Sequence, residues 1–106
     1  MRQFSPTALD TYLQTANPRP VLLDVREPWE YAICHLEGSQ LLPMRHVPTR
    51  LTELDPHCEI VVICHHGIRS LQVARFLEHA GFTQVINLEG GVAAWAHEVD
   101  PQMPSY

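Results

Sequence analysis

The chain has 106 residues, 45% hydrophobic and 18% charged, which is the composition of one globular domain rather than of a disordered or fibrous protein. The formal net charge is −5 and Lys and Arg form no cluster, which argues against nucleic-acid and anionic-membrane partners. The apolar stretches are too short to cross a bilayer, and the polar start lacks the apolar segment of a signal peptide. We therefore expect a single cytoplasmic domain over residues 1–106.

The first half of the chain predicts a helix followed by a buried strand. Ser5-Pro6 supplies a hydroxyl cap and a proline at the first helical position, and the helix should end near Asn17-Pro18. The apolar run 21–25 lies between polar and proline-containing segments and is typical of a buried strand. Weaker patterns indicate a helical turn from Pro28, a minor strand over 40–42 and a helix over 47–54.

The second half contains the strongest strand signal, over residues 59–64, where a continuous Ile/Val run is typical of the centre of a parallel sheet. An amphipathic helix should follow from Ser70 and end at Ala80-Gly81. A strand over 85–88, a last helix from Gly91 and a loosely ordered tail over 100–106 complete the prediction. This alternation of strands and helices predicts an α/β fold with helices on both faces of a parallel sheet.

The most promising site follows the predicted central strand, because ligands of such folds bind beyond the carboxyl ends of the strands. The segment that leaves this strand is Cys64-His65-His66-Gly67-Ile68-Arg69-Ser70. A tight loop that leads into a helix N-terminus points backbone N–H groups inward, and together with the helix dipole these form a cradle for an anion. Such a cradle stabilises a thiolate at its rim.

Two neighbours of Cys64 strengthen this interpretation. Gly67 allows a sharp turn, and Arg69 adds a cation suited to an oxyanion such as thiosulfate. A cysteine at a strand end is otherwise most often a buried structural residue. We retain that structural interpretation for Cys34 and Cys58, which lack such a setting. The odd cysteine count without framework spacing predicts reduced thiols.

Several separated segments occur in the order that is typical of one family. Residues 23–31 contain an Asp-x-Arg signature, 35–39 read His-Leu-Glu-Gly-Ser, 64–70 form the cysteine loop, and Gly90-Gly91 is followed by Trp95. The chain thus resembles the single-domain rhodanese-like sulfurtransferases over nearly its whole length. It departs from their pattern at Cys34, where the family usually has Gly, and at Glu37, where it has Pro. A resolving role for Cys34 as a second thiol is left open.

The resemblance implies a rhodanese-like three-layer fold with a central, about five-stranded parallel sheet and helices on both faces. It implies that Cys64 takes a sulfane sulfur from thiosulfate or a persulfide donor, forms a persulfide and passes the sulfur to cyanide or a thiol. A thioredoxin-like or other sulfur-accepting protein is an expected acceptor, and no cofactor is needed. The loop residues 65–70 would bind the persulfide and substrate. Asp24, Arg26 and His35 would have supporting roles.

Three other interpretations compete with this one. A sulfur-relay or regulatory module acting on a partner protein is the main one. A phosphatase or arsenate reductase of the same fold is weaker, because its loop needs five residues between the Cys and the Arg, and only four separate Cys64 from Arg69. A metal site is not expected, because adjacent residues such as Cys34-His35 rarely converge on one ion.

Overall fold

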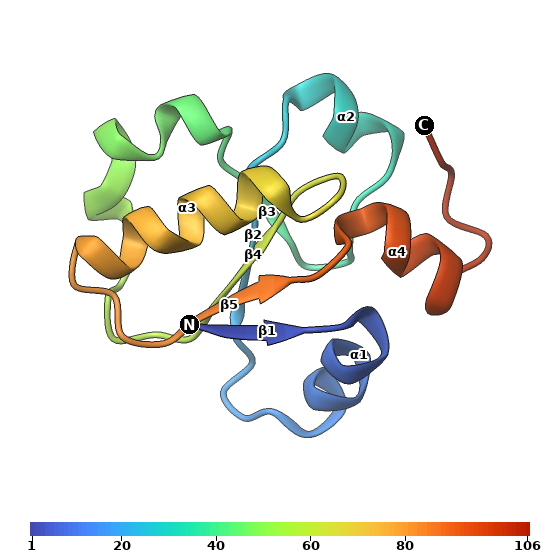
Figure 1. The fold of residues 1–106 in the computed structure, drawn as a ribbon, viewed down its shortest axis with the longest axis horizontal. Helices are drawn as coiled ribbons and strands as arrows, with labels where there is room; N and C mark the ends of the chain where they lie inside the picture. Colours follow the sequence, from blue (N-terminus) through green and yellow to red (C-terminus); the bar gives the residue numbers. More distant parts are fainter.

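A computed structural model describes residues 1–106 and contains one five-stranded sheet (Figure 1). All strand pairs are parallel, and the strand order is β1-β5-β4-β2-β3. The strands are β1 (Arg2–Phe4), β2 (Val21–Asp24), β3 (Gln40–Leu41), β4 (Ile60–Ile63) and β5 (Val85–Leu88). This confirms the predicted parallel α/β fold and the central place of the Ile/Val strand.

Helices connect each pair of successive strands, as parallel pairing requires, and a final helix follows the last strand. They are α1 (Pro6–Thr15), α2 (Pro28–Ile33), α3 (Ile68–His79), α4 (Gly91–Glu98) and the 3₁₀ helices η1 (Met44–His46) and η2 (Pro48–Glu53). The Ser5 hydroxyl accepts a hydrogen bond from the Ala8 N–H and caps α1, as predicted. No helix is both long and apolar enough to cross a membrane.

Two details differ from the sequence prediction. Residues 2–4 form the edge strand β1, which pairs with β5, although their polar sequence gave no strand signal. The helix expected over 47–54 is a pair of 3₁₀ turns. Arg50 has non-helical angles (φ −115°, ψ 17°), which interrupt the helical path at this point.

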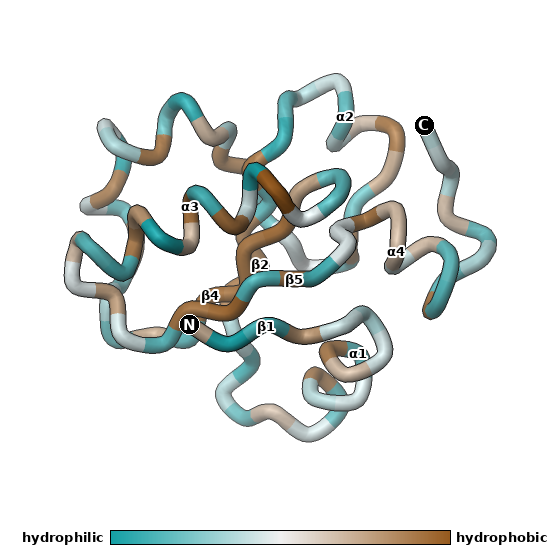
Figure 2. Tube along the Cα trace, viewed as in Figure 1, coloured by the Kyte–Doolittle hydropathy of each residue, from teal (hydrophilic) through white to brown (hydrophobic).

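Two hydrophobic cores cover the faces of the sheet, because alternate residues of a strand point to opposite faces. In β4, Ile60 and Val62 enter the core formed with α3, and Val61 and Ile63 enter the core formed with α1 and α4. The buried strands are therefore apolar on both faces. Figure 2 shows hydrophobic stretches gathered at the centre of the molecule around β2 and β4.

The sheet also decides where a site can lie. Because the strands are parallel, the carboxyl ends of β2, β4 and β5 meet at one edge, where the chain enters α2, α3 and α4. Cys64 follows β4 at this edge, next to the starts of three helices.

Candidate active site

Cys64 lies in a turn between β4 and α3 that donates a backbone N–H to its sulfur. The residue is 1% exposed, and its Sγ accepts a hydrogen bond from the Gly67 N–H at 3.0 Å. Gly67 has a φ of +94°, in the left-handed region that favours glycine. Ile68 and Arg69 begin α3, so their N–H groups are among those that a helix leaves free at its N-terminus. Anionic sulfur beside these donors is favoured by the helix dipole.

Helix α4 holds the same loop from the other side. The N–H groups of Val92 and Ala93 donate to the carbonyls of Cys64 and His65, at 2.9 and 3.1 Å. A side chain at Gly91 would prevent this approach, because its Cβ would lie 2.3 Å from the Cys64 oxygen. The Cys64 carbonyl shares a peptide group with the His65 N–H, and the His65 carbonyl shares one with the His66 N–H. Since the N–H of a trans peptide points opposite to its C=O, these two N–H groups face away from α4.

The sulfur also contacts a buried polar chain. The Cys64 thiol donates to the Ser70 hydroxyl at 3.3 Å, and this hydroxyl donates to Oδ1 of Asn87 at 2.5 Å. All three residues are buried, and every buried polar side-chain atom of the protein has a hydrogen-bond partner. One sequence feature marks Asn87: it is a polar residue inside the apolar strand Val-Ile-Asn-Leu.

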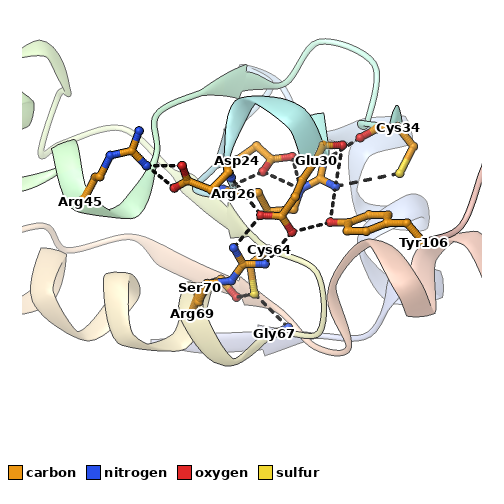
Figure 3. Close-up of polar contacts among 11 residues, drawn as sticks. Asp24, Arg26, Glu30, Cys34, Arg45, Cys64, Gly67, Arg69, Ser70 and Tyr106 are labelled. Carbon is orange, nitrogen blue, oxygen red and sulfur yellow. Dashed lines mark hydrogen bonds and ion pairs between the residues drawn. The ribbon is translucent and has the colours of Figure 1, made fainter. Parts of the chain in front are cut away.

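An ion pair joins α2 to the cysteine loop. Both terminal nitrogens of Arg69 bond the Glu30 carboxylate at 2.8 Å, and Glu30 also accepts from the Tyr106 hydroxyl at 2.7 Å. Figure 3 shows the Glu30 carboxylate between these two partners. The Arg69 guanidinium lowers the pKa of Glu30 to about 2, and Glu30 in turn raises the pKa of Arg69. One donor on each terminal nitrogen of Arg69 is thus engaged with α2, whereas the sequence pattern had suggested an oxyanion partner for the guanidinium.

Arg26 organises the chain around α2 from inside the protein. It is fully buried and pairs with the fully buried Asp24 at 2.7 Å. Its remaining donors bond the Cys34 carbonyl at 2.6 Å and the Tyr106 hydroxyl at 2.8 Å (Figure 3). The pair therefore fixes the turn after β2 and the end of α2, and α2 carries Glu30 to the loop. Neither Asp24 nor Arg26 forms a hydrogen bond with Cys64, and their supporting role stays a prediction.

The rim of the site includes Tyr106, which the sequence did not indicate. Its ring stacks on His65 at 3.9 Å between centroids, and burial raises the pKa of its hydroxyl to about 12. Burial, aided by the neighbouring His66, lowers the pKa of His65. Beside this stack lies a cavity of about 100 Å³ lined by Cys34, His65, His66, Val92, Ala93, Ala96, Pro104, Ser105 and Tyr106.

The remaining predicted site residues lie further out. Ile68 is 69% exposed at the start of α3. His35 is exposed, stacks on Tyr31 and has its Nδ1 2.8 Å from the Tyr31 carbonyl oxygen. It lines a different hollow, of about 420 Å³ between α1 and α4, so the structure does not bring it to the cysteine loop.

The fold and the site define an α/β domain with a cysteine loop between its central strand and a helix N-terminus. The rhodanese-like domain family matches residues 5–98, so the chain belongs to that family. Its relatives include single-domain sulfurtransferases.

The comparison with individual proteins agrees. The chain is 33% identical over 102 residues to the putative sulfurtransferase YtwF of Bacillus subtilis, covering 96% of this chain and 97% of that protein. It is 33% identical over 81 residues to the thiosulfate sulfurtransferase GlpE of Stutzerimonas stutzeri, covering 76% and 74% of the two chains.

Longer relatives and solved structures match as well. The chain is 40% identical to the rhodanese-like/PpiC domain-containing protein 12 of Arabidopsis thaliana over 80% of its own length, but it spans only 30% of that protein. A rhodanese-like domain protein from Staphylococcus aureus superposes with a TM-score of 0.84 at 29% identity, over 93% of this chain and 95% of that chain.

Proposed function

We propose that the protein is a sulfurtransferase of the thiosulfate type in which Cys64 carries the transferred sulfur as a persulfide. The observation that carries the proposal is the position of the Cys64 sulfur at the carboxyl end of β4, 3.0 Å from the Gly67 N–H. A persulfide is an anion at neutral pH, and free N–H groups at a helix N-terminus stabilise an anion. The sulfurtransferase names of the relatives support the same chemistry.

The reaction would proceed in two displacements. The Cys64 thiolate attacks the outer sulfur of thiosulfate, an S–S bond forms, and the bond to the sulfite sulfur breaks. Sulfite leaves with the electron pair of that bond. A cyanide or thiolate acceptor then attacks the outer sulfur of the persulfide, and Cys64 leaves again as a thiolate. The cycle needs no external oxidant.

The backbone supplies most of the anion stabilisation in this proposal. Helix α4 fixes the loop carbonyls, which leaves the N–H groups of residues 65–69 for the outer sulfur. Arg69 is bonded to Glu30, so its direct contribution is to hold α2 against the loop. An oxyanion role for Arg69 would use the N–H donors of the guanidinium that Glu30 does not engage. We also propose a cytoplasmic location, which the three free cysteines support.

A turnover assay with thiosulfate and cyanide tests the proposal. Cys64→Ser should reduce thiocyanate formation to the background rate, because serine has no sulfur on which a persulfide can form. Cys58→Ser is the matched control, since Cys58 is exposed and its thiol bonds Asp55. Thiocyanate formation by the Cys64→Ser protein at the normal rate would disprove the mechanism.

A sulfur-relay role toward a protein acceptor is the second candidate, and the surface around the loop favours it. Trp29 is 63% exposed and Ile68 69% exposed, and Trp29 packs edge-on against Tyr106 beside the loop. Exposed apolar side chains around a reactive group are typical of a surface that receives a partner. The putative sulfur carrier protein YrkF of Bacillus subtilis is among the relatives, at 39% identity over 79 residues.

Acceptor kinetics separate the two roles. With a reduced thioredoxin as acceptor, Trp29→Ala and Ile68→Ala should raise its KM and leave cyanide turnover unchanged if a protein partner docks here. Phe76→Ala is the control, because Phe76 is 40% exposed but lies two turns along α3. Equal effects on both acceptors would argue against docking at this surface.

A further inference from the structure

One buried amide bonds both of the residues that contact the Cys64 sulfur. Asn87, in β5, accepts a hydrogen bond from the Ser70 hydroxyl at 2.5 Å and donates to the Gly67 carbonyl at 3.4 Å. Ser70 and Gly67 are the two residues whose polar groups contact Cys64 Sγ. Asn87 itself is 2% exposed and does not touch the sulfur.

The Gly67 carbonyl sets the orientation of this amide, because a backbone carbonyl oxygen can only accept a hydrogen bond. Nδ2 of Asn87 donates to Oε1 of Gln3, in the adjacent strand β1, at 2.8 Å. Because this acceptor and the Gly67 carbonyl both face Nδ2, the amide presents Oδ1 to Ser70. An amide turned the other way would set its own oxygen against the Gly67 carbonyl oxygen.

The number of hydrogens then limits what Ser70 can do. With a neutral thiol the chain is complete, since the thiol donates to Ser70 and Ser70 donates its one hydrogen to Asn87. When the thiol proton leaves to solvent, the anionic sulfur becomes an acceptor. The single hydroxyl hydrogen can then serve the sulfur or Asn87, but not both.

We propose that Asn87 is a positioning residue that restrains the reactivity of Cys64 by competing with the sulfur for the Ser70 hydroxyl hydrogen. The proposal rests on the proposed role of Cys64 as nucleophile. A hydroxyl that turns to the thiolate makes a charge-assisted bond, but it leaves a buried amide oxygen without a donor. Removing that oxygen removes the competition, so the thiolate should form more readily.

Alkylation of Cys64 by iodoacetamide, followed against pH by peptide mass spectrometry, tests the inference. Peptide analysis separates Cys64 from the exposed Cys58. Asn87→Leu should lower the pH midpoint of alkylation by about one unit, a tenfold change in thiolate population. The rate at pH 7 should rise only about threefold, because a less basic thiolate is also a weaker nucleophile. Asn87→Val is the second variant, since valine suits a buried strand and also lacks the acceptor.

The same substitutions in a Ser70→Ala background provide the decisive comparison. Without the Ser70 hydroxyl, Asn87 and the sulfur have no hydrogen to compete for. Asn87→Leu and Asn87→Val should therefore leave the midpoint of alkylation unchanged in the Ser70→Ala background. Each Asn87 variant is compared with a parent protein that has the same charged and titratable groups around the loop, namely Arg69, Glu30, His65 and His66. Their effect on the midpoint therefore cancels in the comparison. Ser39→Ala is the matched control for Ser70→Ala, because the Ser39 hydroxyl bonds the Leu36 carbonyl and does not contact the sulfur.

The outcomes are distinct. A lower midpoint that depends on Ser70 supports the competition. An unchanged midpoint in both Asn87 variants, or an equal shift with and without the Ser70 hydroxyl, overturns it. The alkylation result does not depend on sulfur transfer. Failure of thiosulfate to load Cys64 would therefore disprove the proposed function and leave the inference about Asn87 to be decided separately.

Discussion

The Glu30–Arg69 ion pair is the contact whose removal should be easiest to measure. Glu30→Gln keeps the shape of the side chain and an oxygen for the Glu27 N–H, but removes the charge that faces Arg69 and the Tyr106 hydroxyl. The Glu30 side chain is 5% exposed and that of Arg69 33% exposed, so water reaches only one partner.

The magnitude follows from the carboxyl titration. The pKa of Glu30 falls from 4.5 to about 2, chiefly through its hydrogen bonds with Arg69. A shift of this size corresponds to roughly 3 kcal/mol of stability at pH 7. Because Arg69 is partly solvated, we expect Glu30→Gln to cost about 2 kcal/mol. For a domain of this length that is a decrease in Tm of roughly 8–16 °C.

The pH dependence has a definite sign. Because the folded pKa of Glu30 is depressed, its contribution is complete above pH 4.5 and is lost as the pH falls toward 2. Urea unfolding at several pH values should therefore show a gap between wild type and Glu30→Gln that closes below pH 4.5. Glu53→Gln is the control, since Glu53 pairs with Arg50 on the surface and its loss should change stability much less. A variant as stable as wild type at pH 7, or a gap unaffected by acid, would refute this reasoning.

Three further predictions test other parts of the site by urea unfolding. Gly91→Ala and Gly81→Ala both place a side chain at positive φ, but only Gly91 has no room for a Cβ. Gly91→Ala should therefore cost at least about 2 kcal/mol more than Gly81→Ala, and equal losses would contradict the tight approach of α4. Arg26→Lys should cost about 3 kcal/mol, because an ammonium cannot replace the guanidinium fork on buried Asp24, and a neutral result would exclude that role. Tyr106→Phe should cost about 1 kcal/mol through the lost hydroxyl contacts, and unchanged stability would show that the hydroxyl is not held.

The sequence predicted the fold well where local patterns decide it. The apolar runs of β2, β4 and β5 mark strands buried on both faces, and their alternation with helices requires parallel pairing. Strand β1 was missed because it is a short edge strand with two exposed residues, and it forms only through pairing with β5. Its partner lies more than 80 residues away, where no local pattern can point to it.

The candidate site likewise contains residues that the sequence could identify and residues that it could not. The cysteine loop is contiguous, so its glycine, its helix start and its place after a strand could be identified in the sequence. Glu30, Asn87 and Tyr106 reach the loop through contacts between residues distant in sequence, such as the 39-residue separation of Glu30 from Arg69. The role expected for Arg69 illustrates the limit, because the sequence showed a free cation and gave no sign of its carboxylate partner.

Sulfur loading of Cys64 is the central claim, and intact-protein mass spectrometry after brief exposure to thiosulfate tests it most directly. We predict that wild type gains the mass of one sulfur atom and that cyanide or a dithiol removes it, while Cys64→Ser gains nothing. Absence of the adduct on wild type with both thiosulfate and a persulfide donor, or an equal adduct on Cys64→Ser, would contradict the account.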